Sequence, residues 1–517
     1  MAEITQIKLL NVPLESDHKN TIYFASKQAQ ESYFNSKVIS SYSYGDFNYI
    51  RKDNIIQVPV VYDDIATCNY IMYKNTKFSN KWYYAFDEKV EYENEGTTNL
   101  YIKTDVIQTW LFDYTVKASF VEREHTNDDT IGANTVPENL ELGTYVNNGI
   151  VTDTNLENFV YIVQASEPSN GSSSIADKHT NMGGVEVPGV VYVCESASVL
   201  ANVIALYDSE GKGDAITNVY LVPKKVVNKE DFSVLRFNGQ ENPVSYEVEI
   251  TKPQTLDSHS PRNNKLLTFP YCYLIMDNNN GTSNILQFEN FSTNNCKFEV
   301  KGVPTVGGSI KCTPKMYKNL DLNFQEGIMC GKFPICGWVN DTYINWLTQN
   351  AVNIGIGIAS SGLSIVGGAG LMMTGGGAMS GASSIVSGAM GIANAVGQVY
   401  QHSLMPDSAR GNTNGGDINA CSNLNKFFFL SMSIKKEFAK IIDDYFDMYG
   451  YKTNRVKVPN TNHRANWWYT KTINVNIDGE VPQADMQEIK ACYDSGITFW
   501  KNPSNIENYN VDNSITV

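Results

Sequence analysis

The first 150 residues alternate apolar and polar positions with a period of two, which is the pattern of half-buried β-strands. Clear examples are residues 49–64, YIRKDNIIQVPVVYDD, and residues 99–124, NLYIKTDVIQTWLFDYTVKASFVERE. One short helix interrupts this pattern within SKQAQESYF, because Ser26 is a suitable N-cap. We predict that the inward face of this helix holds Ala29, Tyr33 and Phe34.

Residues 151–340 have a different pattern, in which polar turns recur between short apolar runs. The turns include SEPSNGSSS and DSEGKGD, and the runs include GVVYVC and NVYLVP. Residues 271–291 read as a β-hairpin with Asn280-Gly281 at its turn. We predict that this region is an insertion of one or two small β-rich domains.

Residues 407–517 combine helices with strands. SIKKEFAKIIDDYFDMYG is predicted to be an amphipathic helix that ends at Gly450, and residues 466–479 are predicted to be a strand. A second helix is expected between Pro482 and Gly496. The predicted class is mainly β (α+β). The apolar face expected for the first helix consists of Ile434, Phe438, Ile441, Tyr445 and Met448.

Residues 341–406 form an apolar block. After Asp341, it contains no Asp, Glu, Lys or Arg until Asp407. Two arms, Ile354–Met373 and Ala378–Val399, flank a glycine turn. Each arm is about 20 residues long, or roughly 30 Å as a helix, which matches the hydrocarbon core of a bilayer. The turn follows Thr374 and consists of Gly375, Gly376 and Gly377.

The two arms contain two kinds of residue with distinct expected roles. Small residues in the second arm recur at helical spacing and would allow close approach of two helices; they are Gly381, Ser384, Gly388, Gly391 and Ala395. Apolar side chains expected to contact lipid in the first arm are Ile354, Ile356, Ile358, Leu363, Ile365, Val366, Leu371, Met372 and Met373. Those in the second arm are Ile385, Val386, Met390, Ile392, Val396 and Val399.

Three interpretations of the apolar block compete. It is a pair of buried core helices, a flexible linker, or a hairpin that is hidden at first and enters a membrane when released. A linker is disfavoured because Ile, Leu, Val and Met are too frequent for a solvated tether. Permanent membrane residence is disfavoured because the Ala, Gly and Ser content makes the arms only mildly hydrophobic. We favour the conditionally exposed hairpin.

Charge and composition exclude several classes of protein. The 517 residues carry a formal net charge of −15, which argues against tight nucleic-acid binding. An acidic surface fits solubility, and it also fits a wall that repels DNA. The nine cysteines are scattered without any CxxC, which indicates reduced thiols and no structural zinc. The start MAEITQIKLL has charges where a signal peptide has an apolar core.

No catalytic, metal-binding or cofactor-binding residues are predicted. The chain lacks a Walker A loop, an HExxH motif and a GxSxG motif, and its six histidines are far apart. DNNNGT at Asp277 lacks the full ligand series of a calcium loop. The expectation is therefore a protein that is not an enzyme and needs no cofactor.

Several stretches form a distinctive series: LLNVPLESDHKNTIYF, QAQESYF and the run from DVIQTWLFDYTVKASFVEREHTNDD to VPENLELGTY, with DDYFDMYGYKTNRVKVPN, NWWYTKT and SGITFWKN near the C-terminus. In their order and spacing they resemble the distal tail tube, or tail knob, protein of small short-tailed bacteriophages (podoviruses) of Gram-positive bacteria. Residues 151–340 match least well. The motif residues are Asn11, Val12, Pro13, Leu14, Asp105, Gln108, Thr109, Phe120 to His125, Asp128, Asp129, Gly132, Pro137, Glu138 and Gly143.

This resemblance implies a homohexameric tube that extends the tail and carries DNA outward. Residues 1–150 and 407–517 would build a tail-tube-like β-barrel domain together, residues 151–340 would be inserted knob domains, and residues 341–406 would be the long membrane-active loop. It implies that the loops plug the lumen and later form a pore in the host cytoplasmic membrane. Implied partners are other copies of the chain, upper tail tube or collar proteins, DNA in transit and that membrane. The implied location is the distal end of the virion tail, and the host membrane during infection.

Two other functions stay open at this point. One is a receptor-binding protein whose middle domain contacts the cell wall, and the other is an envelope-degrading enzyme. Glu122, Arg123 and Glu124 are expected either to form salt bridges between subunits or line the tube, or to be a solvated strand end. The tryptophans expected to pack in the tube domain are Trp110, Trp467, Trp468 and Trp500.

Overall fold

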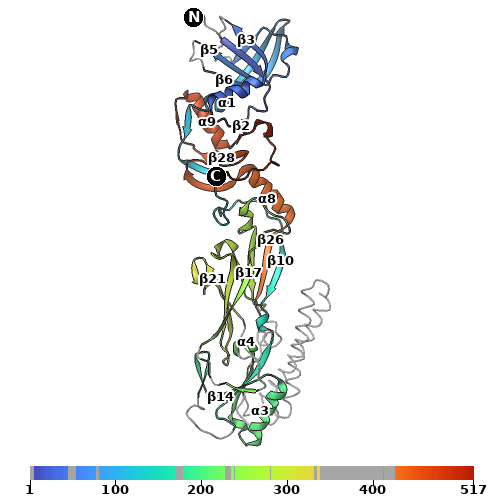
Figure 1. Ribbon diagram of the computed structural model, residues 1–517, viewed down its shortest axis with the longest axis vertical. Helices are drawn as coiled ribbons and strands as arrows, with labels where there is room; N and C mark the ends of the chain where they lie inside the picture. The colour runs from blue at the N-terminus through green and yellow to red at the C-terminus, as the bar shows by residue number, and fades with distance from the viewer. Residues whose placement is uncertain are drawn as a thin grey trace. The chain divides into compact units, whose positions relative to one another are not determined.

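The computed structural model describes residues 5–44, 54–76, 81–169, 179–227, 234–237, 239–240, 242–279, 281–330, 335–337, 411–412 and 426–516. They belong to two compact units, each drawn from segments far apart in the chain. Unit 1 comprises Met1–Gly143, His259–Leu266 and Lys436–Val517, and unit 2 comprises Thr144–Ser258 and Leu267–Lys435. Both are built mainly of strands (Figure 1), so the predicted mainly β class is confirmed. The described strands form open sheets, with no closed barrel among them.

The first sheet of unit 1 has six described strands in the order β3-β1-β5-β6-β7-β4, all antiparallel. One face of this sheet buries a cluster of aliphatic side chains that includes Ile7, Ile56 and Leu100. The alternation read from the sequence therefore marks a real core face. The strands are β1 (Thr5–Leu10), β3 (Val38–Tyr44), β4 (Ile55–Val58), β5 (Tyr70–Asn75), β6 (Tyr83–Asn94) and β7 (Thr97–Thr104).

Helix α1 (Lys27–Ser36) covers part of the opposite face of this sheet. The Ser26 hydroxyl accepts a hydrogen bond from the backbone N–H of Ala29, so the predicted N-cap is confirmed. Phe34 is fully buried and stacks on Tyr70 at 5.3 Å. The predicted inward position of Ala29 is wrong, because that residue is exposed and Gln30 is buried instead.

The second sheet of unit 1 joins the two ends of the chain. Its order is β2-β30-β28-β9-β27, in which β9 from the N-terminal segment lies between two C-terminal strands. β2 pairs with β30 in parallel. Figure 1 shows β28 in red beside blue N-terminal elements of the same unit. The strands are β2 (Asn20–Ile22), β9 (Ser119–Glu124), β27 (Tyr451–Lys457), β28 (Trp467–Ile473) and β30 (Ile497–Trp500), with β8 (Tyr114–Val116) and β29 (Ile477–Gly479) as a separate pair.

The described residues of unit 1 contain three further helices. Residues 99–124 are not one strand, because α2 (Val106–Trp110) interrupts them with Asp105 as its N-cap. α9 (Gln483–Ser495) lies where it was predicted, with Pro482 as its N-cap and Gly496 at φ +96° ending it. α8 (Lys436–Tyr449) also confirms a predicted helix.

The predicted inward face of α8 is right only in part: Phe438, Tyr445 and Met448 are half-buried, but the other two predicted residues do not belong to this face. Ile434 belongs to a strand, and Ile441 is 66% exposed. The buried residues of α8 lie on a neighbouring face, where a carboxylate is accommodated by hydrogen bonds. They are Ala439, Ile442, Asp443 and Phe446.

Unit 2 contains a four-stranded antiparallel sheet in the order β10-β26-β18-β19. The strands are β10 (Tyr145–Thr152), β18 (Cys272–Asp277), β19 (Ser283–Leu286) and β26 (Phe428–Ile434). β18 and β19 form the predicted hairpin. One face of the sheet packs on a neighbouring sheet through Phe429 and Phe298, whose rings lie 4.6 Å apart.

The remaining elements in the described part of unit 2 form three sheets and two helices. One sheet has the order β16-β14-β11-β15-β24-β25, one is the pair β12-β13, and one has the order β17-β20-β21-β22 with β23 also on β21. The strands are β11 (Phe159–Ala165), β12 (His179–Met182), β13 (Val185–Pro188), β14 (Val190–Cys194), β15 (Ile216–Pro223), β16 (Val234–Arg236), β17 (Val244–Thr251), β20 (Asn295–Gly302), β21 (Ile310–Tyr317), β22 (Leu320–Leu322), β23 (Ile328–Met329), β24 (Ile335–Gly337) and β25 (Gly411–Asn412). The helices are α3 (Ala197–Ser209) and α4 (Lys224–Val227). Short 3-10 turns are η1 (Tyr62–Ile65), η2 (Thr154–Leu156), η4 (Gly213–Ala215), η5 (Asn264–Leu267), η6 (Phe288–Asn290) and η7 (Pro503–Asn505).

Candidate functional site: the base of the apolar block and a buried polar network

The strands on either side of the apolar block pair with each other. β24 precedes the block and β25 follows it, and they are antiparallel neighbours, with Ile335 opposite Asn412 and Cys336 opposite Gly411. β24 also pairs with β15, so this junction belongs to a sheet of unit 2. Residues 338–410 therefore leave the described part of unit 2 and return to it at adjacent positions.

The predicted membrane-active residues themselves lie outside the described residues. This holds for the apolar side chains from Ile354 to Val399, for the glycine turn at Gly375, Gly376 and Gly377, and for the small residues from Gly381 to Ala395. Their roles stay predictions. Among the helices in the described ranges, none is both long and apolar enough to cross a membrane.

The motif residues Arg123 and Glu138 form a buried ion pair in unit 1. Lys265, from the His259–Leu266 segment, also pairs with the Glu138 carboxylate. The backbone N–H of Lys452 donates to the same carboxylate at 2.9 Å, and Arg123 donates to the Gly450 carbonyl at 2.7 Å. Burial lowers the pKa of Lys265, and Glu138 opposes that shift. One carboxylate thus ties together all three chain segments of unit 1.

The expectations for Glu124 and Arg123 are corrected by this arrangement. Glu124 is fully buried, and it accepts hydrogen bonds from the Lys457 ammonium and from the backbone N–H of Asn460, each at 2.7 Å. Both residues find their partners within one chain because β9 runs between β27 and β28. They are neither a solvated strand end nor charges free to reach another subunit. Glu122 is half-buried and pairs with Lys471 at 3.0 Å.

His125 is held as a neutral imidazole inside unit 1. Its Nδ1 accepts a hydrogen bond from the backbone N–H of Tyr469 at 2.7 Å, so the proton is on Nε2, which donates to the Asp447 carbonyl at 3.0 Å. Burial, with Arg464 and Arg123 nearby, lowers the pKa of His125 to about 3. The ring therefore serves as a fixed bridge between β28 and α8.

Asp443 on α8 binds the His259–Leu266 segment. Its fully buried carboxylate accepts hydrogen bonds from the ring of His259 at 2.9 Å and from the backbone N–H of Arg262 at 3.0 Å. Asn263 donates both its backbone N–H, at 3.1 Å, and its side-chain amide, at 2.9 Å. Asp447, one turn later, also accepts from the Asn263 amide at 2.7 Å. This segment is consequently fastened to α8 by carboxylates.

The Asp129 carboxylate, from the N-terminal segment, also binds the His259–Leu266 segment. Asp129 accepts a hydrogen bond from the backbone N–H of Asn264 at 3.0 Å, and the Tyr451 hydroxyl donates to it. Burial raises the pKa of Asp129, while Tyr451 and Asn264 oppose the shift. The motif residues after β9 thus hold the His259–Leu266 segment in place.

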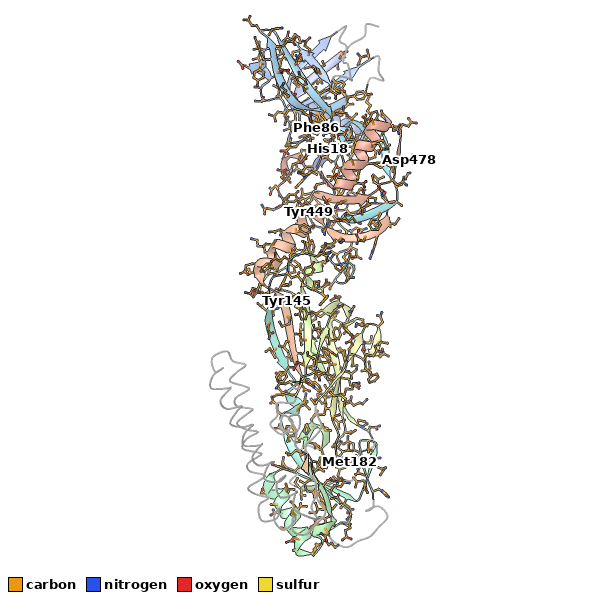
Figure 2. The ribbon with its side chains drawn as sticks, turned by 180° about the vertical axis from the view of Figure 1, so that it is seen from behind. His18, Phe86, Tyr145, Met182, Tyr449 and Asp478 are labelled. Carbon is orange, nitrogen blue, oxygen red and sulfur yellow. The ribbon has the colours of Figure 1, made fainter. Side chains whose placement is uncertain are left out.

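A third cluster lies around Asp105 in unit 1. Its carboxylate caps α2 by accepting from the Gln108 N–H at 3.0 Å, and it accepts from the Tyr70 hydroxyl at 2.8 Å. His18 lies 3.8 Å from it and contacts the Phe86 ring edge-on at 5.2 Å (Figure 2). Gln108 donates to the Ile22 carbonyl at 2.7 Å, which links α2 to β2. Motif residues therefore order the first segment of unit 1 as well.

The motif at Asn11 and Val12 serves a similar structural purpose. Asn11 donates its side-chain amide to the Thr67 carbonyl at 3.1 Å. Val12 exchanges two hydrogen bonds with the Asn69 side chain, at 2.9 and 2.7 Å. These contacts hold the chain after β1 against the loop before β5.

Gly143 is the motif residue at the end of the first segment of unit 1. Its φ of +62° lies in the left-handed region, and a Cβ there would come within 2.3 Å of the Phe438 ring on α8. Only glycine fits this position without strain. The packing of α8 therefore depends on the absence of a side chain at residue 143.

The tryptophans predicted to be packing residues are confirmed as such. Trp110 and Trp468 lie in one hydrophobic cluster of unit 1, and Trp467 lies 5.0 Å from Trp500. In the described ranges, no group of three or more His, Cys, Asp or Glu side chains is placed to hold a metal ion. Seven of the described cysteines are free and buried; they are Cys68, Cys194, Cys272, Cys296, Cys312, Cys330 and Cys492.

Sequence reasoning missed the importance of Asp443, Asn263 and Gln30. Asp443 was visible as an acidic residue in a helix with many apolar positions, but its partners lie about 180 residues away in the chain. The Gln30 amide donates to the Gln108 carbonyl at 2.8 Å and is therefore buried. Such partners become apparent only when the three segments of unit 1 are seen together.

Comparison with known families matches most of the chain. The model for the C-terminal domain of the tail knob protein gp9 of Bacillus phage phi29 matches residues 235–514. The model for the N-terminus of the caudoviral major tail protein matches residues 3–115. Together these matches include the His259–Leu266 segment and most of the other two segments of unit 1, whereas residues 116–143 lie outside both.

Individual relatives match over the full length. The tail knob protein gp9 of Bacillus phage B103 is 26% identical over 98% of this chain and 97% of its own length. The phage phi29 protein of the same name is 25% identical over 99% of this chain and 98% of its own length. The structure of the bacteriophage C1 tail knob protein gp12 has a TM-score of 0.67 and 16% identity, covering 99% of this chain and all of that one, so the fold is shared.

The matched gp9 domain covers more than half of the chain. It includes the parts of unit 1 that carry most of the polar network, namely the His259–Leu266 segment, α8 and the C-terminal strands. The chain therefore belongs to the family of the Bacillus phage phi29 tail knob protein gp9, a structural component of the virion tail.

Proposed function

We propose that this chain forms a homohexameric tube at the distal end of the tail, through which DNA passes into the host. In this proposal the apolar block at residues 341–406 plugs the lumen of the closed particle. On release, the arms enter the host cytoplasmic membrane and open a path for DNA. The upper tail tube or collar proteins hold the other end of the tube.

The interleaved build of unit 1 supports a subunit that carries mechanical load. β9 lies between β27 and β28, and the Glu138 carboxylate joins the three segments through Arg123 and Lys265. To pull the N-terminal segment from the C-terminal one, force must break the pairing of β9 with β27 and β28, the β8–β29 and β2–β30 pairs, and a buried ionic cluster. Such a subunit can stay intact while DNA moves under pressure.

The charge of the chain supports transit rather than tight binding of DNA. Each copy carries a formal charge of −15. Tight binding to DNA requires Lys and Arg that displace counterions from phosphates, and a ring of acidic copies has the opposite field. DNA would therefore not adhere to the wall.

The observation that carries the proposal is the pairing of β24 with β25. It places the two ends of residues 338–410 side by side in one sheet, while residues 342–406 hold no charge. A segment attached in this way can change its environment without separating the strands that bracket it. The remainder of unit 2 can therefore keep its hydrogen bonds while the block enters lipid.

The sequence of the block suits lipid better than water. Each glycine costs roughly 1 kcal/mol against alanine in a helix in water. Inside a bilayer, unpaired backbone groups are so costly that helix formation is enforced, and small residues allow helices to pack closely. The stripe from Gly381 to Ala395 would then serve as a helix contact.

Leakage of dye from lipid vesicles tests the membrane role. The full chain, activated by mild heating or by low denaturant, should release dye, and a chain lacking Ile354–Val399 should not. The double variant Ile385→Asp with Ile392→Asp should also fail, because each buried charge costs about 3 kcal/mol at the bilayer centre.

A matched control carries one added aspartate outside the block, at Val185→Asp, since Val185 is exposed on β13. This variant should release dye as the parent chain does. The membrane role is wrong if the deleted chain still permeabilises the vesicles, or if charges in the block leave release unchanged.

A further inference from the structure

The four-stranded sheet of unit 2 carries a row of aliphatic side chains across its whole width. Ile150 on β10 lies opposite Leu430 on β26, Leu430 lies opposite Ile275 on β18, and Ile275 lies opposite Ile285 on β19. These residues face away from Phe429, whose face of the sheet packs on Phe298. The row is half-buried in its middle and exposed at its ends, since Ile150 is 43% exposed and Ile285 is 57% exposed.

The two ends of this row lie on the two edge strands. Among the described residues, the sheet order ends at β10 on one side and at β19 on the other. Figure 1 shows β10 beside β26 along the margin of unit 2. Val151, which follows Ile150 on β10, is also 43% exposed. Both edges thus present apolar side chains to their surroundings.

Neither edge strand is protected by a charge or a proline, although β10 has a bulge between Asn147 and Gly149 and β19 has only four residues. β10 reads YVNNGIVT and β19 reads SNIL, and neither contains a charged residue or a proline. Edge strands are usually protected by lysines, prolines or inward-pointing charges, and an uncharged, apolar edge pairs with another strand. Because copies of this chain repel each other at a formal charge of −15 each, neutral edges are also where two copies approach at least electrostatic cost.

The strand directions allow one copy to continue the sheet of the next. The pairs β10–β26, β26–β18 and β18–β19 are all antiparallel, so β10 and β19 run in opposite directions. When copies are related by rotation about an axis along the strands, every β10 points the same way. β19 of one copy then meets β10 of its neighbour as an antiparallel pair, which continues the pattern.

We infer that β19 of one copy of this chain pairs with β10 of the next copy, so that the aliphatic row runs on from subunit to subunit. Such a head-to-tail contact leaves no free edge once the ring closes, whereas a two-fold contact between two β10 strands would leave both β19 edges open. The contact rests on the proposed homo-oligomeric tube and names the strands that build it. Ile150 and Ile285 are its central side chains.

Placing a charge on each edge strand gives the first test. Ile285→Lys and Ile150→Lys place exposed charges at the contact, so each full-length variant should fold and should need at least about tenfold more protein to assemble. Assembly is measured by analytical ultracentrifugation, and folding by circular dichroism. Val185→Lys, at an exposed strand position on β13, is the matched control and should assemble as the parent chain does.

Cross-linking tests the head-to-tail arrangement. A chain with both Ile150→Cys and Ile285→Cys, treated with a flexible bismaleimide, should give a ladder of covalent multimers. A mixture of the two single variants should give dimers only, and each single variant alone should give monomers. A chain with Ile150→Cys alone that forms dimers would show a two-fold contact and overturn the inference.

The experiments distinguish an error in the proposed β19–β10 contact from an error in the proposed tube. If the parent chain assembles and both lysine variants assemble equally well, the strand assignment is wrong while the proposed tube stands. If the parent chain stays monomeric at every concentration and in virions, both are wrong.

Discussion

The carboxylate of Asp443 on α8 accepts hydrogen bonds from both the backbone N–H and the side-chain amide of Asn263, which lies 180 residues earlier in the chain. Through this pair, a helix of the C-terminal segment holds the short His259–Leu266 segment inside unit 1. The contact explains why unit 1 is compact although segments of unit 2 interrupt it twice along the chain. We therefore expect substitution of Asp443 to lower the stability of unit 1.

Replacing Asp443 by alanine should destabilise unit 1 by about 3–5 kcal/mol, because the buried donors of Asn263 and His259 lose their acceptor. Unfolding by denaturant, followed by tryptophan fluorescence, measures the loss. Asp444→Ala removes only a pair with Arg262 in which both side chains are about half exposed, so it should cost about 0–1 kcal/mol. Equal losses in the two variants would show that the Asp443 cluster has no special role.

Glu138→Gln should be as damaging, because it leaves the buried charges of Arg123 and Lys265 without their shared counter-charge. The expected loss of stability is about 3–5 kcal/mol. Glu141→Gln changes an exposed residue and should stay within about 0.5 kcal/mol of the parent chain. Calorimetry of the two variants measures the difference, and a Glu138→Gln chain that melts with the parent would refute the assignment.

Gly143→Ala should lower stability by about 2 kcal/mol or more, since a positive φ alone costs about 1–2 kcal/mol and the new Cβ would overlap the Phe438 ring. Gly96→Ala is the control, because nothing lies within 4 Å of a Cβ there. The thermal midpoints of both variants measure the effect. An unchanged midpoint for Gly143→Ala would mean that α8 does not approach residue 143 in solution.

Asp447 should make stability depend on pH in a definite direction. Burial raises the pKa of Asp447 to about 6, above its ordinary value, although the Asn263 amide and Arg262 oppose the shift. Between pH 4 and 6 the folded state then binds more protons at this group than the unfolded state, so the group's contribution to stability falls as the pH rises. Asp447→Asn should remove this slope.

Comparison of the parent chain with Asp447→Asn isolates the contribution of Asp447 to the pH dependence of stability. His125, whose pKa is about 3, makes stability rise with pH, but it is present in both chains and cancels in the comparison. Relative to Asp447→Asn, the parent should lose about 1–2 kcal/mol between pH 4 and 6. Denaturant midpoints at four pH values measure the difference. A difference that is flat or grows with pH in favour of the parent would contradict the burial of Asp447.

Local signals in the sequence predicted elements well where the determinants are close in the chain. Ser26 caps α1 through Ala29, and Gly496 ends α9 with a positive φ. The β18–β19 hairpin followed from its turn residues. In each case, a few neighbouring residues decide the backbone conformation.

Burial could not be predicted where polar groups have distant partners. The inward face of α8 contains Asp443 rather than Ile441, because the carboxylate finds four hydrogen bonds in a distant segment. Gln30 replaces Ala29 at the buried face of α1 for the same reason. Hydrophobicity alone therefore assigns the wrong face whenever a buried network satisfies a polar side chain.

The motif of Arg123 and Glu124 shows the same limit at the candidate site. Its order in the sequence indicated the family, but its charges were expected at a surface, whereas they are buried within one chain. The strand β9 that carries them lies between two strands from residues 451–473. No pattern within residues 120–125 contains that information.

Fluorescence from a label inside the apolar block tests the central proposal most directly. A polarity-sensitive dye is attached to Ser387→Cys in virions, which are mixed with vesicles that contain a nitroxide lipid, and emission is recorded before and after DNA release. A dye at Val185→Cys on β13 is the control and should not respond. We predict that the dye at residue 387 is unquenched in the filled particle and is quenched by the lipid once DNA has left. A dye at that position that stays unquenched after complete DNA release would contradict the proposal that the block moves from the protein into a membrane.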